Sequence, residues 1–268
     1  MSRTRLLAAP LAVLLAVGLA ACGGGTPSAE SPTPTATRTT ATPTPTPTPT
    51  VEALSAENVL TRMAAAQAGI TSYDLAMSVT GTTSMEMTGS ADLAAGKRNA
   101  AVVMSDPEMG GIEMRFVDGL MYLNLGELTG GLFLQLDPND TSNELSTAFA
   151  GFDDMLVKSG FEGTEQAVVS VTAVGAPETL DGVEVQAYEV VLDTTKFTPE
   201  ATSELLEEGM AALPPTVTYT YWIDGDDVPR KTVYEINGAV TTLTISKLGA
   251  GTPVTAPAAD QVTTDLPF

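Results

Sequence analysis

Few residues in this chain are of a type that could carry chemistry. Its 268 residues include a single cysteine, Cys22, and no histidine. A disulfide needs a second cysteine and a thiolate metal site needs several ligands, so neither can be built around Cys22 within this chain. The lack of histidine removes the commonest general base and excludes a Ser-His-Asp triad. Carboxylates therefore remain as the candidates for acid–base chemistry.

Carboxylate pairs occur at Asp153-Asp154 and Asp226-Asp227. A glycosidase needs two carboxyl groups that face each other, but adjacent residues of a helix point apart, and the second pair follows Gly225 in a predicted loop. Residues 137–144 (DPNDTSNE) resemble a calcium loop but lack its sixth-position glycine and a correctly spaced final glutamate, so a turn before a helix is expected. We predict a protein that is not an enzyme, with no metal site and no cofactor.

The N-terminal segment gives Cys22 a role outside the fold. Arg3 and Arg5 form a basic start, residues 6–17 are apolar, and small residues lead into the cysteine, which is typical of a secretory signal. The apolar run is shorter than the roughly 20 residues of a membrane span. Residues 19–22 (LAAC) resemble the lipobox of bacterial lipoproteins, which implies cleavage after residue 21 and lipidation of Cys22. An ordinary signal with an incidental cysteine is the alternative.

The rest of the chain divides at residue 50. Residues 22–50 are dominated by threonine and proline, which predicts a disordered tether in an extended polyproline form that could reach roughly 75 Å. The same composition is found in O-glycosylated stalks. Residues 51–268 are long enough for one large domain or two small ones, and the absence of a second linker favours one. The predicted organisation is a signal peptide (1–21), a lipidated cysteine with its tether (22–50) and a single domain (51–268).

The charge of the chain excludes one class of partner. There are 33 acidic and 12 basic residues, and two of the basic ones lie in the signal, so the mature chain has a net charge of −23. Lysine and arginine drive binding to phosphates, so we expect no nucleic-acid partner. Attraction to anionic headgroups is equally unsupported, and the lipid anchor alone is expected to hold the protein to the membrane.

The domain mixes helices and strands. Residues 55–69 predict an amphipathic helix capped by Ser55, and residues 143–160 and 198–215 predict two more, the last capped by Thr198. Alternating apolar residues at 73–79 predict a strand, as do residues 217–227, 230–238 and 239–248. Two-residue hairpin turns are indicated by Asp118-Gly119, Asp181-Gly182 and Asn237-Gly238, and they imply an antiparallel meander. The predicted fold class is α+β, a single curved antiparallel sheet, or half-open β-barrel, with helices on its concave face.

Ten methionines follow the signal, against one tryptophan in the chain. Methionine is unbranched and polarizable, so it can line a surface that adapts to an irregular apolar ligand, although it also fills gaps in ordinary cores. A curved sheet covered by helices could enclose such a cavity. The residues expected to line it are Leu75, Met77 and Val79 on one strand, Met114 and Phe116 on another, and Leu145, Phe149 and Phe152 on a covering helix.

Several segments together carry a family resemblance. They are the lipobox, the tether, YDLAMSVTG (73–81), FVDGLMYLNL (116–125), TYWIDGDDVPRKTVYE (220–235) and VTAPAADQVTTDLPF (254–268). In these segments and in the order of its elements, the chain resembles the actinobacterial LppX/LprG group of lipoproteins, within the LolA-like superfamily of half-barrel lipid carriers. The resemblance implies an incomplete β-barrel with an apolar cavity and no catalytic residues. It also implies a cargo of acylated lipids or lipoglycans.

The expected protein is therefore a lipoprotein anchored to the outer face of the cytoplasmic membrane. It binds and carries or chaperones acyl-chain lipids or lipoglycans, with an envelope transport protein as a possible partner. Two alternatives come from other classes. One is a surface adaptor or sensor that binds an envelope protein without lipid cargo, and the other is a hydrolase.

Overall fold

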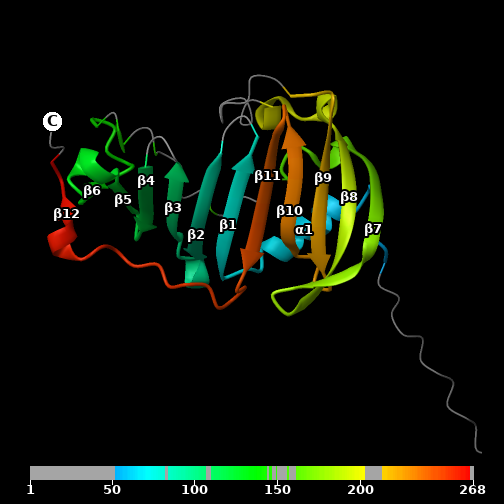
Figure 1. The fold of residues 1–268 in the computed structure, drawn as a ribbon, viewed down its shortest axis with the longest axis horizontal. Helices are drawn as coiled ribbons and strands as arrows, with labels where there is room; N and C mark the ends of the chain where they lie inside the picture. The colour runs from blue at the N-terminus through cyan, green and yellow to red at the C-terminus, as the bar shows by residue number, and fades with distance from the viewer. Residues whose placement is uncertain are drawn as a thin grey trace, which may run out of the picture. The chain divides into compact units, whose positions relative to one another are not determined.

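A computed structural model describes residues 52–81, 84–106, 110–143, 145, 146, 149, 156, 161–202 and 213–265. Within these ranges the strands belong to one open sheet that curves around the helix α1 (Val59–Gln67) (Figure 1). The strands are β1 (Ser72–Thr80), β2 (Met85–Asp92), β3 (Asn99–Asp106), β4 (Gly110–Val117), β5 (Leu120–Asn124), β6 (Phe133–Leu136), β7 (Val168–Leu180), β8 (Val183–Asp193), β9 (Thr216–Asp224), β10 (Pro229–Ile236), β11 (Ala239–Ser246) and β12 (Val262–Thr263). Short 3₁₀ turns are η1 (Ala94–Gly96), η2 (Gly126–Thr129), η3 (Glu165–Ala167), η4 (Thr194–Lys196) and η5 (Ala259–Gln261).

The sheet consists of two meanders joined side by side. Its strand order is β12-β6-β5-β4-β3-β2-β1-β11-β10-β9-β8-β7, so β1 to β6 form one meander and β7 to β11 the other. The two meet where β1 pairs antiparallel with β11. The α+β class and the curved sheet are thus as predicted, with one difference: β12 pairs with β6 in parallel, because the C-terminal segment reaches that edge after crossing the sheet.

All three predicted hairpin turns are confirmed. Asp118-Gly119 connects β4 to β5, Asp181-Gly182 connects β7 to β8, and Asn237-Gly238 connects β10 to β11. Both residues of each turn have positive φ, for example 52° at Asp118 and 85° at Gly119. Such turns match the right-handed twist of the flanking strands and favour Asp or Asn followed by Gly.

The first predicted helix is confirmed but begins later than expected. The Ser55 backbone N–H donates to the Asn58 side-chain oxygen (2.8 Å), and the Val59 N–H donates to the Ser55 carbonyl (3.0 Å). This turn delays the start of α1 to Val59. Val59 and Met63 are fully buried against β8 and β9. Hydrophobic burial of this helix face therefore forms the core at the β7–β9 end of the sheet.

The other two predicted helices are described only in part. The Asn143 side chain accepts from the Leu145 N–H (3.0 Å), where residues 145 and 146 are helical, so residues 137–143 do form a turn before a capped helix. The Thr198 hydroxyl accepts from the Ala201 N–H (3.2 Å), which confirms Thr198 as a cap. Of the remaining residues, Phe149 and Leu156 lie in turns and residues 213–215 are not helical, and the others lie outside the described residues.

The C-terminal segment packs on the sheet face opposite α1 at the β4–β6 end. It runs from β11 past β1 to the far edge (Figure 1). The Thr252 N–H donates to Asp74 (2.7 Å), and Val254 packs with Val117, Tyr122 and Phe133. Both faces of the β4–β6 end are therefore packed, which holds this half of the sheet in place without a helix on the outer side.

Candidate functional site

Strand register assembles one continuous face from separate stretches of sequence. The inner face is the face against which α1 packs, and directly paired residues of neighbouring strands lie on the same face. One lateral row consists of Leu75, Gly89, Val102 and Met114 on β1 to β4, and the next row consists of Met77, Met87, Met104 and Ile112. Through β11 and β10, the row of Met77 continues to Tyr221 on β9. The inner face therefore extends from β6 to β8.

The inner face is packed at its two ends and half-buried in its centre. At the β7–β9 end, Val190, Tyr221 and Ile223 pack against α1 with exposures of 0–5%. At the β4–β6 end, Phe116, Met121 and Leu134 are equally buried. Between them lies a set of apolar side chains that are all partly exposed, which we call the central patch: Leu75, Met77, Val79, Met85, Met87, Val102, Met104, Ile112, Met114, Leu243 and Ile245.

The predicted cavity residues fall into two groups. Met114, which lies at the border of the central patch, packs with Leu145 and Phe149 against the buried cluster at the β4–β6 end that contains Phe116. Leu75, Met77 and Val79 share the inner face but belong to the central patch, and Leu75 lies in the lateral row of Met114. Phe152 and Cys22 lie outside the described residues. The strand residues of the predicted cavity thus share one face of the sheet, but they lie in regions that are packed differently.

The methionines gather on this face. Met77, Met85, Met87, Met104 and Met114 belong to the central patch, and Met121 is buried beside it. Sequence reasoning noted the methionines but placed only Met77 and Met114 in the site. The alternation at Met85-Met87 and Val102-Met104 could have added the other two strands, but their common face depends on strand register. An adaptable apolar surface is the property that such a cluster of thioethers provides.

A pocket of about 660 Å³ opens at one border of the central patch. It lies between the last turn of α1, the start of β1 and the end of β11, with Ile70, Tyr73 and Ile245 among its apolar lining residues. Polar groups at its rim come from Gln67, Glu162 and the β2–β3 connection. Burial raises the pKa of Tyr73 above its usual value. The size and the mixed lining are those of small-molecule sites.

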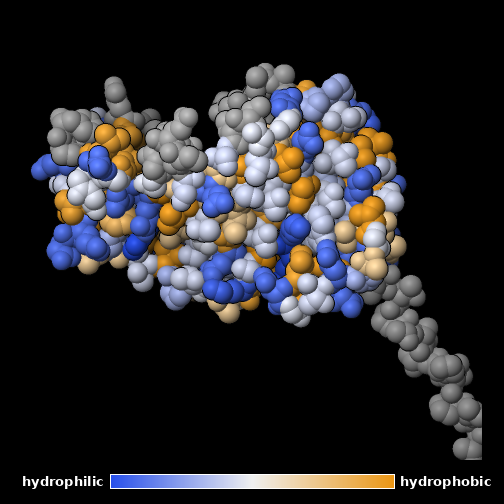
Figure 2. Space-filling model, viewed as in Figure 1, coloured by the Kyte–Doolittle hydropathy of each residue, from blue (hydrophilic) through white to orange (hydrophobic). Residues whose placement is uncertain are grey.

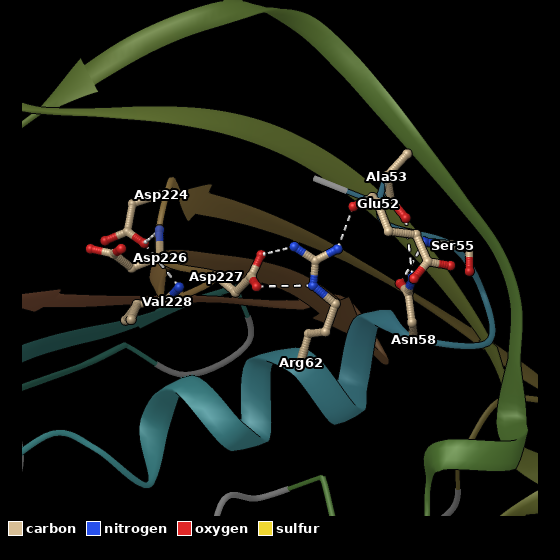
Figure 3. A network of polar contacts seen from close by, with 9 residues as sticks. All are labelled: Glu52, Ala53, Ser55, Asn58, Arg62, Asp224, Asp226, Asp227 and Val228. Atoms are coloured by element: carbon tan, nitrogen blue, oxygen red, sulfur yellow. Dashed lines mark hydrogen bonds and ion pairs between the residues drawn. The ribbon is translucent and has the colours of Figure 1, made fainter. Parts of the chain in front are cut away.

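Two carboxylates of the WIDGDD segment, those of Asp224 and Asp227, make structural contacts. Arg62 of α1 makes two bonds to Asp227, from Nη2 (2.7 Å) and Nε (2.9 Å), and Nη1 donates to the Glu52 carbonyl (2.6 Å) (Figure 3). Asp224 accepts from the Val228 N–H (2.9 Å) and from Arg230 Nε (2.6 Å). This network ties α1 and the chain entering the domain to the β9–β10 turn. Asp153-Asp154 lies outside the described residues.

Three tyrosine rings pack together on the inner face. Tyr219 and Tyr221 have ring centroids 5.6 Å apart, and Tyr234 follows at 4.9 Å from Tyr219. Burial, and next the neighbouring phenols of Tyr219 and Tyr234, raise the pKa of Tyr221 well above its usual value. These rings close the packed end of the inner face.

The outer face differs from the inner one. Figure 2 shows this side of the sheet, where hydrophilic and hydrophobic residues are interleaved over the strands. Among the described residues, large exposed apolar side chains are scattered at Val103, Leu128, Leu132 and Val169. Scattered apolar residues are ordinary on a protein surface, so the continuous apolar set on the inner face is the stronger candidate for a site.

Two features are absent from the described ranges. These ranges contain no group of three or more Cys, Asp or Glu residues that could hold a metal ion. No helix in these ranges is long and apolar enough to cross a membrane.

Known proteins resemble this chain in fold alone. No family model and no curated protein matches its sequence. Among solved structures, LppX from Mycobacterium tuberculosis is 19% identical, with 75% of this chain and 98% of that chain covered and a TM-score of 0.47. LprF from Mycobacterium bovis is 16% identical (76% and 97% covered, TM-score 0.48). MucB from Pseudomonas aeruginosa, in complex with MucA, is 12% identical (77% and 59% covered, TM-score 0.36).

Proposed function

We propose that this protein is an extracytoplasmic lipoprotein that binds acyl-chain lipids on the central patch and carries or chaperones them. The observation that supports this function is the patch itself. Its apolar side chains are half-buried and contiguous, and they lie between two well-packed cores. Covering apolar surface is favourable by about 25 cal/mol per Å², and a flexible acyl chain could cover a patch of irregular shape. The cargo would be an acylated lipid or a lipoglycan.

The proposal does not require catalysis. The chain has no histidine, and the carboxylates of Asp224 and Asp227 accept hydrogen bonds that hold the β9–β10 turn and α1 in place. The lipobox supports an anchor at Cys22, on the outer face of the cytoplasmic membrane. A carrier at this place would exchange its cargo with the membrane or with an envelope transport protein.

Cys22→Ala tests the anchor. The variant should either be released from the membrane or keep its signal uncut, because lipidation requires the thiol. Fractionation of cells, followed by mass measurement of the mature N-terminus, distinguishes these outcomes. A processed variant that still sediments with membranes would contradict lipid anchoring at Cys22.

Native mass spectrometry of the protein purified from its own host tests the cargo. We expect a bound lipid in the parent protein. Met114→Trp fills the inner face without adding charge, so it should reduce lipid occupancy with little change in Tm. Val103→Trp is the matched control, because Val103 lies on the outer face and is 41% exposed, so occupancy should be unchanged.

The opposite result would favour a different class of protein. If the parent protein carries no lipid and Met114→Trp sharply lowers Tm, the inner face is a solid core. Overpacking a tight interior typically costs 1–3 kcal/mol. Together with co-purification of an envelope protein, this result would replace the carrier with a surface adaptor.

A further inference from the structure

The pocket at the border of the central patch has a basic rim in an otherwise acidic protein. Lys97 and Arg98 both line this pocket of about 660 Å³, and both line a second hollow of about 380 Å³ on the other side of the same loop. The formal net charge of the chain is −21, so two adjacent basic residues at one pocket are unusual in this protein. In the described part of the chain, the other adjacent basic pair is Arg230-Lys231.

Lys97 and the Arg230-Lys231 pair are used differently. Arg230 donates to the buried Asp224 (2.6 Å), and Lys231 lies over the Trp222 ring at 4.3 Å, so the second pair is held within the fold. Lys97 contacts Asp92 at 3.0 Å, but its side chain is 52% exposed at the pocket rim. An exposed ion pair contributes little to stability, so a ligand anion can compete for this ammonium group.

Local backbone geometry places Lys97 and Arg98 at the rim. Ala95 (φ 54°) and Gly96 (φ 79°) are both left-handed, and the Lys97 N–H donates to the Ala94 carbonyl (3.0 Å). The Ala94 N–H in turn donates to Asp92 (3.2 Å). A non-glycine residue in this conformation is uncommon and is held there by its surroundings. The tight turn brings two cations to the mouth of an apolar pocket.

We infer that this pocket binds the anionic end of the lipid cargo, with Lys97 and Arg98 contacting a phosphate and the acyl chains lying along the central patch. The inference rests on the proposed function and specifies its ligand class. The apolar floor of Ile70, Tyr73 and Ile245 adjoins the patch, so one molecule can reach both regions. Glu162 also lines the pocket and would repel an anion, which favours binding on the side of the two cations.

Calorimetry with two soluble lipids tests the inference on the full-length chain. Dioctanoyl phosphatidate and dioctanoylglycerol have the same acyl chains and differ by the phosphate. We expect the phosphatidate to bind about tenfold more tightly, which is the size of one charge-assisted hydrogen bond. The preference should shrink between about 50 mM and about 500 mM salt, because exposed charges are screened.

Two double variants separate local from global charge. Lys97→Gln with Arg98→Gln should abolish the preference and leave the affinity for dioctanoylglycerol unchanged. Lys196→Gln with Lys247→Gln makes the same change in net charge at exposed ion pairs elsewhere, and it should keep the preference. If the first double variant fails to fold, the inference is tested by the parent protein alone, through its relative affinity for the two lipids.

Three binding results would contradict the inference or the proposed function. Equal affinities of the parent protein for both lipids would overturn the anionic subsite and leave the carrier intact. Binding of neither lipid would overturn the carrier itself. Inorganic phosphate that binds as tightly as dioctanoyl phosphatidate would show a site for free phosphate, and it would overturn the assignment to a lipid.

Discussion

The α1 end and the centre of the inner face have similar strands and different packing. On β8 and β9, Val190 and Tyr221 are 0% and 5% exposed beneath α1. On β1 and β2, Met77 and Met87 lie in the same lateral row as Tyr221 but are only half-buried. The strands do not cause this difference, because both regions alternate apolar side chains in the same way. What covers each region decides whether its apolar face is a core or a candidate site.

The packed end and the half-buried centre contribute differently to stability and to function. A filled core stabilises the fold through close packing, and it loses that packing when a side chain is shortened. A partly exposed apolar surface contributes less to folding and remains available to a ligand. Substitutions in the two regions should therefore separate stability from lipid binding.

The largest effect is expected at the packed end. Met63 is 0% exposed and packs in the α1 cluster, so Met63→Ala should leave a cavity and lower the free energy of unfolding by about 2–5 kcal/mol. Urea denaturation with tryptophan fluorescence measures the change. A loss below about 1 kcal/mol would mean that this end is not the rigid core of the domain.

The ion pair between α1 and the β9–β10 turn should have a smaller effect. Arg62 and Asp227 are 24% and 26% exposed, and their bidentate contact ties α1 to the sheet. Arg62→Met should lower the free energy of unfolding by about 1–2 kcal/mol. A double-mutant cycle with Asp227→Asn isolates the interaction. A coupling energy near zero would mean that the helix is held by its apolar face alone.

Alkaline pH should weaken the packed end through Tyr221. Because the folded state raises the pKa of Tyr221 above 10.0, the unfolded chain loses this proton first as pH rises, and the contribution to stability is lost from about pH 10 upward. Tm should therefore fall between about pH 9 and pH 11. Tyr221→Phe removes this titration, so the fall should be smaller in the variant. An equal fall in both proteins would assign it to other groups.

The smallest effect on stability is expected in the central patch. Met87→Ala should lower the free energy of unfolding by less than about 1 kcal/mol, because its side chain is already partly exposed. It should nevertheless reduce lipid occupancy in native mass spectra. A loss as large as that of Met63→Ala would remove the distinction between the two regions.

The local chemistry of the turns made much of the sheet predictable. Asp-Gly and Asn-Gly pairs favour positive φ by themselves, so three hairpins could be identified without knowledge of the rest of the chain. Thr198 was identified as a cap for the same reason, since capping involves a residue and its near neighbours. The start of α1 was placed too early, because the competing turn at Asn58 depends on a local hydrogen bond that its sequence does not specify.

The candidate site was predictable in part. Alternation placed Leu75, Met77 and Val79 on one strand face, and Met114 and Phe116 on another, and the register confirms that these faces are the same. Lys97 and Arg98 were missed. Their adjacency was visible in the sequence, but two adjacent basic residues indicate a binding site only when the fold places a pocket beside them.

The sequence alone determined features that depend on short-range interactions: the strands, the turns between them and the apolar alternation along each strand. Tertiary structure decided the pairing of β1 with β11, the common inner face and the contrast between packed ends and half-buried centre. These three features depend on contacts between residues that are far apart in the sequence. The energy of an apolar side chain depends on what covers it, and for Met77 and Val190 that is set by chain segments far away in sequence.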